Sequence, residues 1–109
     1  MSMELSKENI KKIKAYLANK PVNKAYLFGS FVRGEATKDS DLDILVELDY
    51  TKPIGLLFVQ MKLDLEQLLN QEVDLVSANG ISRYLKPAID REKVLIWAAD
   101  NRNSPIFWY

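Results

Sequence analysis

Hydrophobic residues recur along the chain with two spacings, which predict helices alternating with strands. Ser6 has the residue type of a helix N-cap, and apolar residues follow it at helical spacing up to Leu17, before Pro21 interrupts the pattern. A second helical stripe runs through residues 54–70, after Pro53, a residue that can open a helix. The chain therefore contains two predicted amphipathic helices.

Shorter apolar segments predict strands between and after these helices. Residues 25–28 form an apolar run that ends at a Gly-Ser turn. Residues 41–49 alternate between mostly acidic and apolar side chains, and residues 72–76 form another short run. Residues 82–89 predict a last helix, whose course Pro87 leaves open, and residues 93–98 predict a closing strand or helix. This order of elements predicts an α/β (α+β) fold, with a small sheet flanked by helices.

Length and composition predict one domain. The chain has 109 residues, of which 48% are hydrophobic, enough for one core, so we expect a single domain over residues 1–109 with a C-terminal tail at 99–109. No apolar run approaches the roughly 20 residues that cross a bilayer, and the charged N-terminus lacks the features of a secretory signal. We therefore expect a cytoplasmic protein that does not bind membranes.

Two missing residue types narrow the possible chemistry. The absence of cysteine and histidine excludes disulfides, thiolate or imidazole metal sites, and Ser-His-Asp catalysis. Fifteen basic residues balance fifteen acidic ones, unlike the net positive charge with which proteins bind nucleic acid, so no direct nucleic-acid partner is expected. An enzyme of this composition has to use carboxylates, hydroxyls, amines and backbone donors.

Acidic residues on two predicted strands are the strongest chemical signal. Asp41 and Asp43 stand two apart on one strand, so their carboxylates leave the same face with Cα atoms about 6.6 Å apart. Asp74 on the next strand adds a third acid if the strands are neighbours. Such an array suits one or two Mg²⁺ ions, although solvated strand faces carry the same alternation.

The turn after the first predicted strand has the features of a phosphate-binding site. Gly29 and Ser30 leave backbone donors open there, and Arg33 can add a positive charge. A Gly-Ser pair is also common in ordinary turns, and a single arginine is also common on protein surfaces.

Two other motifs fail on their required residues. Glu35 and Ala36 stand where a P-loop needs Lys and Ser or Thr, while Ile44 and Tyr50 stand where an EF-hand needs Gly and Glu.

Together these residues form a known pattern. The stretch 29–36, GSFVRGEA, followed by SDLDI at 40–44, resembles the signature of the DNA polymerase β-like nucleotidyltransferase superfamily. In length and motif the chain is similar to the minimal nucleotidyltransferase (MNT) family over residues 5–98. The resemblance implies a nucleotidyltransferase fold with a mixed sheet. It also implies that Gly29 and Ser30 hold the triphosphate, that Asp41 and Asp43 bind Mg²⁺, and that Asp74 is a third acid of the metal and catalytic site, with a phosphate role for Arg33.

The same resemblance implies a biological role. Proteins of the MNT family are commonly encoded beside HEPN-domain proteins, which implies an antitoxin that forms a hetero-oligomer with a HEPN toxin. The family chemistry implied is transfer of AMP from ATP to a tyrosine of the toxin. Two alternatives remain open at this point: an antitoxin that acts by binding alone, and a nucleotidyltransferase that modifies a small molecule.

Overall fold

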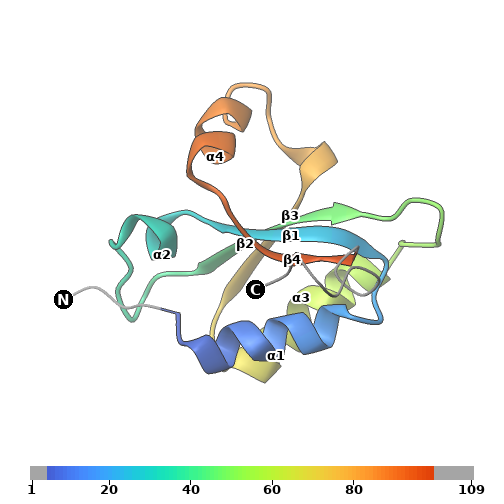
Figure 1. Ribbon diagram of the computed structural model, residues 1–109, viewed down its shortest axis with the longest axis horizontal. Coiled ribbons are helices and arrows are strands. Elements are labelled where there is room, and N and C mark those ends of the chain that lie inside the picture. Colours follow the sequence, from blue (N-terminus) through green and yellow to red (C-terminus); the bar gives the residue numbers. More distant parts are fainter. Residues whose placement is uncertain (1–4, 100–109) are drawn as a thin grey trace, which may run out of the picture.

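The computed structural model describes residues 5–99, which form a four-stranded sheet with helices on both of its sides (Figure 1). In chain order the elements are α1 (Lys7–Leu17), β1 (Val22–Phe28), α2 (Ser30–Arg33), β2 (Leu42–Leu48), α3 (Leu57–Leu69), β3 (Val73–Ser77), a 3₁₀ turn (Ala78–Gly80), α4 (Lys86–Glu92) and β4 (Val94–Ala98). The strands lie in the order β3-β2-β1-β4. Strands β2 and β3 are parallel, and the other neighbours are antiparallel. The predicted fold class and the mixed sheet are therefore confirmed.

Helices α1 and α3 lie together on one face of the sheet (Figure 1). The N-cap prediction for α1 is confirmed, because the backbone N–H of Asn9 donates to Ser6 Oγ at 3.1 Å. The apolar stripes of both helices are buried against the strands. Fully buried side chains of this core include Ile13, Leu17, Leu42, Ile44, Met61 and Leu65. Burial of these side chains is the main force that holds the sheet and the two helices together.

Two predicted helix boundaries are wrong, for local reasons. Helix α3 begins at Leu57 rather than after Pro53, because Gly55 has φ 43° and so lies outside the helical region. Helix α4 covers 86–92 rather than 82–89, with Pro87 in its first turn, where its missing N–H breaks no helical hydrogen bond. The segment left open at 93–98 forms strand β4. Of the predicted tail, only Ala99 falls within the described residues.

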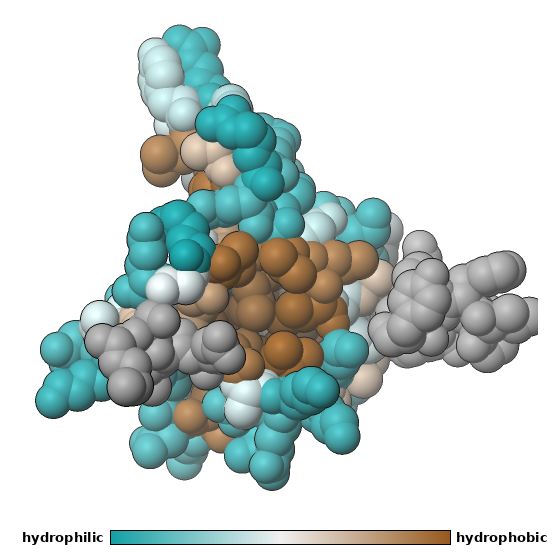
Figure 2. Space-filling model, turned by 60° about the vertical axis from the view of Figure 1, so that its left-hand side comes forward, coloured by the Kyte–Doolittle hydropathy of each residue, from teal (hydrophilic) through white to brown (hydrophobic). Residues whose placement is uncertain are grey.

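The opposite side of the sheet is less covered. Helix α4 stands off on that side (Figure 1), and none of its residues is buried. Strand β4 is an edge strand, and its Val94 and Leu95 are about half exposed, at 49% and 46%. Figure 2 shows a broad hydrophobic area on one side of the molecule, bordered by polar residues above and below. Within residues 5–99, no helix is both long enough and apolar enough to span a membrane.

The core makes a direct prediction for stability. Leu65 is fully buried in α3, so Leu65→Ala removes buried methyl groups and leaves a cavity, which should lower the free energy of unfolding by about 2–5 kcal/mol. Leu63→Ala makes the same change on the same helix at a half-exposed position, and should cost less than about 1 kcal/mol. Urea unfolding of both variants measures the difference. Equal losses would contradict the assignment of Leu65 to the core.

Candidate active site

The parallel pairing of β2 and β3 brings the predicted acids together. In that register Asp43 lies directly opposite Asp74, so both side chains leave the same face of the sheet. Asp41 directly precedes β2 and stands two residues before Asp43, on the same side. The neighbouring Leu42 and Ile44 are fully buried toward the core. The acids therefore lie on the face opposite to the one that α1 and α3 cover.

The electrostatics of Asp43 reflect this crowding. Partial burial, followed by the negative charges of Asp74 and Asp41, raises the pKa of Asp43 to about 6, and the positive charge of Arg33 partly opposes this rise. A carboxyl group in this setting is costly to ionise while the site is empty. A bound cation would remove that cost.

A fourth acid, which the sequence analysis did not select, extends the array. Glu72 directly precedes β3, and its backbone C=O accepts a hydrogen bond from the N–H of Leu42 at 2.8 Å. A side-chain hydrogen bond with Asp41, together with the negative charge of Asp41, raises the pKa of Glu72. The sequence carried a signal for this residue, because acids at 72 and 74 flank Val73 as acids at 41 and 43 flank Leu42.

Gly29 connects the acid array to the predicted phosphate-binding turn. It directly follows β1 and has φ 78° and ψ −153°, a conformation that is essentially restricted to glycine. A Cβ at this position would lie 2.9 Å from Asp43 Cγ and would collide with the carboxylate oxygen. Ser30 follows as the first residue of α2. The structure therefore brings the Gly-Ser turn directly beside Asp43.

Arg33 lies at this turn, but two acids engage it. Its Nε lies 2.8 Å from Glu35 Oε1, and its Nη1 lies 3.1 Å from Glu92 Oε2. Glu92 also accepts a hydrogen bond from the backbone N–H of Gly29, with its Oε1 at 2.9 Å. Hydrogen bonds to Glu35 and Glu92 raise the pKa of Arg33. The sequence analysis missed Glu92, because it belongs to no motif and reaches the turn only through folding.

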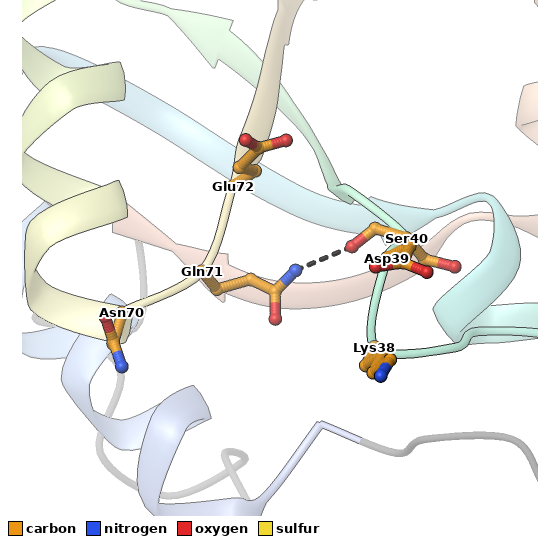
Figure 3. A pocket seen from close by; sticks show the side chains of 6 residues that line it. All are labelled: Lys38, Asp39, Ser40, Asn70, Gln71 and Glu72. Atoms are coloured by element: carbon orange, nitrogen blue, oxygen red, sulfur yellow. Dashed lines mark hydrogen bonds between the residues drawn. The ribbon is translucent and has the colours of Figure 1, made fainter.

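A polar pocket borders the array on the side where β2 and β3 begin (Figure 3). Its volume is about 310 Å³, and it lies between the 38–40 loop and the 70–72 loop. Figure 3 shows Gln71 reaching across it, where its Nε2 donates to the C=O of Ser40 at 2.6 Å. The lining residues are Lys38, Asp39, Ser40, Asn70, Gln71 and Glu72. This hydrogen bond ties together the two loops that lead into Asp41 and Asp74.

The donor set suits a hard cation. Within residues 5–99, no three acidic side chains converge closely enough to form a completed metal cage. Mg²⁺ does not require one, since it binds through one or two carboxylates and fills its remaining positions with water and substrate phosphates. Neighbouring carboxylates on one open face, one of them with a raised pKa, fit that mode of binding.

Comparisons with known proteins agree with this geometry. The family described as polymerase beta, nucleotidyltransferase matches residues 11–102. The protein adenylyltransferase MntA of Thermococcus cleftensis is 41% identical over 70 residues, which cover 64% of this chain and 70% of that protein. A solved structure described as a candidate minimal nucleotidyltransferase has a TM-score of 0.59 and 37% identity, and the match covers 80% of this chain and 85% of the other.

A more distant neighbour shares the fold. It is a tri-AMPylated Shewanella oneidensis HEPN toxin in complex with an MNT antitoxin, with a TM-score of 0.65 and 20% identity, and the match covers 93% of this chain and 79% of the other. At this identity the likeness is one of fold alone. The family match and the more similar relatives confirm both the resemblance to minimal nucleotidyltransferases and the expectation of an enzyme. The chain belongs to the polymerase beta nucleotidyltransferase family.

Proposed function

We propose that the protein is the antitoxin of a HEPN/MNT pair and that it transfers AMP from ATP to a tyrosine hydroxyl of its HEPN toxin, in a reaction that requires Mg²⁺. The observation that carries the proposal is the placement of Asp43 opposite Asp74, with Gly29 in contact range of Asp43. The name of the Thermococcus relative, a protein adenylyltransferase, supports a protein as acceptor. The AMPylated toxin bound to the Shewanella antitoxin supports a HEPN protein in that role.

Each predicted residue has a place in this chemistry. Asp41, Asp43 and Asp74 are the proposed metal ligands, of which one or two would bind any one ion, and bound Mg²⁺ would neutralise the triphosphate and stabilise charge on the departing oxygen. Gly29 and Ser30 are proposed to hold the triphosphate, with a phosphate contact from Arg33. The acids and the turn lie side by side, so positioning and charge stabilisation can both act at one site.

The proposed reaction is a single displacement at the α-phosphate of ATP. The acceptor hydroxyl oxygen forms a bond to the α-phosphorus while the bond from that phosphorus to the bridging oxygen breaks, and pyrophosphate leaves. The hydroxyl proton passes to a carboxylate, for which Asp74 is the proposed acceptor because it lies on the exposed edge strand β3. A protein acceptor can approach this edge from solution.

The protein surface supports a protein partner. Tyr84 and Leu85 just before α4 are 79% and 59% exposed, and the hydrophobic area of Figure 2 adds apolar surface. Exposed apolar groups of this kind are common where proteins bind one another. We propose a hetero-oligomer with the toxin on this basis.

The acids provide the central test. Asp41→Asn and Asp43→Asn should each lower AMP transfer to a co-purified HEPN partner by about 100-fold or more, because each change removes a proposed metal ligand and its charge. Intact-mass spectrometry of the partner, after incubation with ATP and Mg²⁺, counts the AMP units added. Asp39→Asn is the matched control, since it makes the same change in the exposed loop next to the site and should leave transfer unchanged.

Three results would reject this assignment. Full transfer by Asp41→Asn and Asp43→Asn would remove the acids from the mechanism. A wild-type protein that binds the partner tightly without modifying it would instead favour an antitoxin that acts by binding alone. If AMP is transferred to an antibiotic or metabolite while the toxin stays unmodified, the substrate is a small molecule.

Gly29 gives a second prediction. Gly29→Ala should lower transfer at least tenfold, because the new methyl group displaces the Asp43 carboxylate and strains the backbone. Gly34→Ala is the control, since Gly34 also has positive φ, at 75°, but a Cβ there would meet nothing within 4 Å. The ratio of the two activities, measured on variants that both melt cooperatively, isolates the collision with Asp43. Equal losses would show that only backbone strain matters.

The raised pKa of Asp43 predicts a pH-dependent stability. Its value of about 6 lies above the ordinary value of 3.8, so the folded protein holds this proton more tightly than the unfolded chain does. The resulting stabilisation is complete below pH 4 and is lost as the pH rises through 6. Asp43→Asn should therefore raise the Tm of the metal-free protein by roughly 2–5 °C at pH 7.5, a modest gain because solvent screens this partly exposed group.

Thermal melts in EDTA from pH 4 to pH 8 measure this effect. The gain in Tm should shrink toward zero as the pH falls to 4, because Asp43 is then protonated in the folded protein and no longer carries a crowded negative charge. A gain that does not change with pH would mean that Asp43 does not titrate near 6.

A further inference from the structure

Glu92 has hydrogen-bond partners that suit an anion. One carboxylate oxygen accepts the backbone N–H of Gly29 at 2.9 Å and lies 3.2 Å from Arg33 Nη1, and the other lies 3.1 Å from the same Nη1. These donors, an amide N–H and a guanidinium, are the kinds that bind a phosphate oxygen. Glu92 comes from the end of α4, 63 residues after Gly29 in the chain. A carboxylate from a distant element therefore occupies donors of the turn.

The negative charges around the turn oppose the binding of a further anion. Asp43, Asp74 and Asp41 already repel one another, and Glu92 adds to the negative charge that raises the pKa of Asp43. The guanidinium of Arg33 is shared between Glu35 and Glu92. A triphosphate that approaches this turn would therefore meet a carboxylate on the donors it needs.

We propose that Glu92 is a built-in competitor of the nucleotide, which occupies the donors of Gly29 and Arg33 until a phosphate group of the triphosphate displaces it. The proposal rests on the phosphate-binding role of this turn in the proposed function. It adds a residue that sets nucleotide affinity without contacting the reacting atoms. The protein with an empty site keeps its donors satisfied, and nucleotide binding has to break the contacts of Glu92.

The surroundings allow the side chain to leave while the helix end stays in place. The next residue, Lys93, is anchored, because its N–H donates to the C=O of Ile89 at 2.8 Å and its Nζ lies 2.9 Å from Asp90 Oδ1 and 4.4 Å from the centre of the Tyr26 ring. The side chain of Glu92 itself is 24% exposed. Rotation about its own bonds can carry the carboxylate toward solvent.

Binding of AMP-PNP with Mg²⁺ to the full-length protein, measured by calorimetry, tests the proposal. Glu92→Gln keeps the size of the side chain and removes its charge, and should lower the Kd about tenfold, because hydrogen bonds between charged groups are roughly twice as strong as neutral ones. Glu35→Gln is the matched control, since Glu35 also pairs with Arg33 but does not contact Gly29 in the described structure. Its Kd should stay within about twofold of the wild-type value, because the Glu92 contact remains.

If Glu92 competes with the nucleotide, Glu92→Gln should change the affinity only for ligands that carry phosphate groups. Pyrophosphate with Mg²⁺ should also bind more tightly to Glu92→Gln, whereas adenosine should bind the variant and the wild type equally. An unchanged or higher Kd for AMP-PNP in Glu92→Gln, in a variant with wild-type Tm, would overturn the proposal and make Glu92 a support for Arg33.

The same experiment separates this inference from the proposed function. AMP transfer to the toxin with an unchanged Kd in Glu92→Gln would leave the function standing and reject the competitor. Tighter AMP-PNP binding in Glu92→Gln without any transfer to a protein would uphold the competitor and reject the proposed acceptor. If neither wild type nor Glu92→Gln binds AMP-PNP, the turn is no phosphate site and both proposals fail.

Discussion

The parallel register between β2 and β3 is the constraint on which the site depends. It fixes Asp43 opposite Asp74, and because side chains alternate along a strand, it also sends Leu42, Ile44, Val73 and Leu75 into the core. A shift of one residue would bury the acids and expose the apolar side chains. Hydrophobic burial on one face therefore fixes the positions of charges on the other, against their mutual repulsion.

This division explains why the two faces of the sheet are built differently. Helices α1 and α3 bury side chains such as Leu17 and Leu65, and their packing can offset the cost of crowded carboxylates. Helix α4 buries no residue and is linked to the site mainly through polar contacts. A rigid layer thus positions the acids, while a loosely packed element supplies Glu92, whose contacts can be exchanged for those of a ligand.

The sequence predicted what depends on local pattern. Alternation revealed Asp41 and Asp43, and the Gly-Ser turn was recognisable because few residues tolerate the backbone of Gly29. The sequence could place Asp74 beside the other acids only if their two strands were neighbours, and strand order is a tertiary property. Glu72 was visible as an alternating acid, but its place beside Asp41 depends on the same pairing of β2 and β3. Glu92 lacked any local signal, because it meets Gly29 across 63 residues of chain.

Arg33 shows how the sequence can locate a residue and still miss its pairing. The motif marked it as a cation beside the predicted phosphate-binding turn. In the structure Arg33 lies at that turn and pairs with Glu35 and Glu92. Charge counting along the sequence could not show this, because the two acids come from a loop and from a helix end. The candidate site is rich in carboxylates, so the guanidinium of Arg33 has acidic side chains close to it. Internal pairing therefore follows from the same charge density that would draw a cation to the acids.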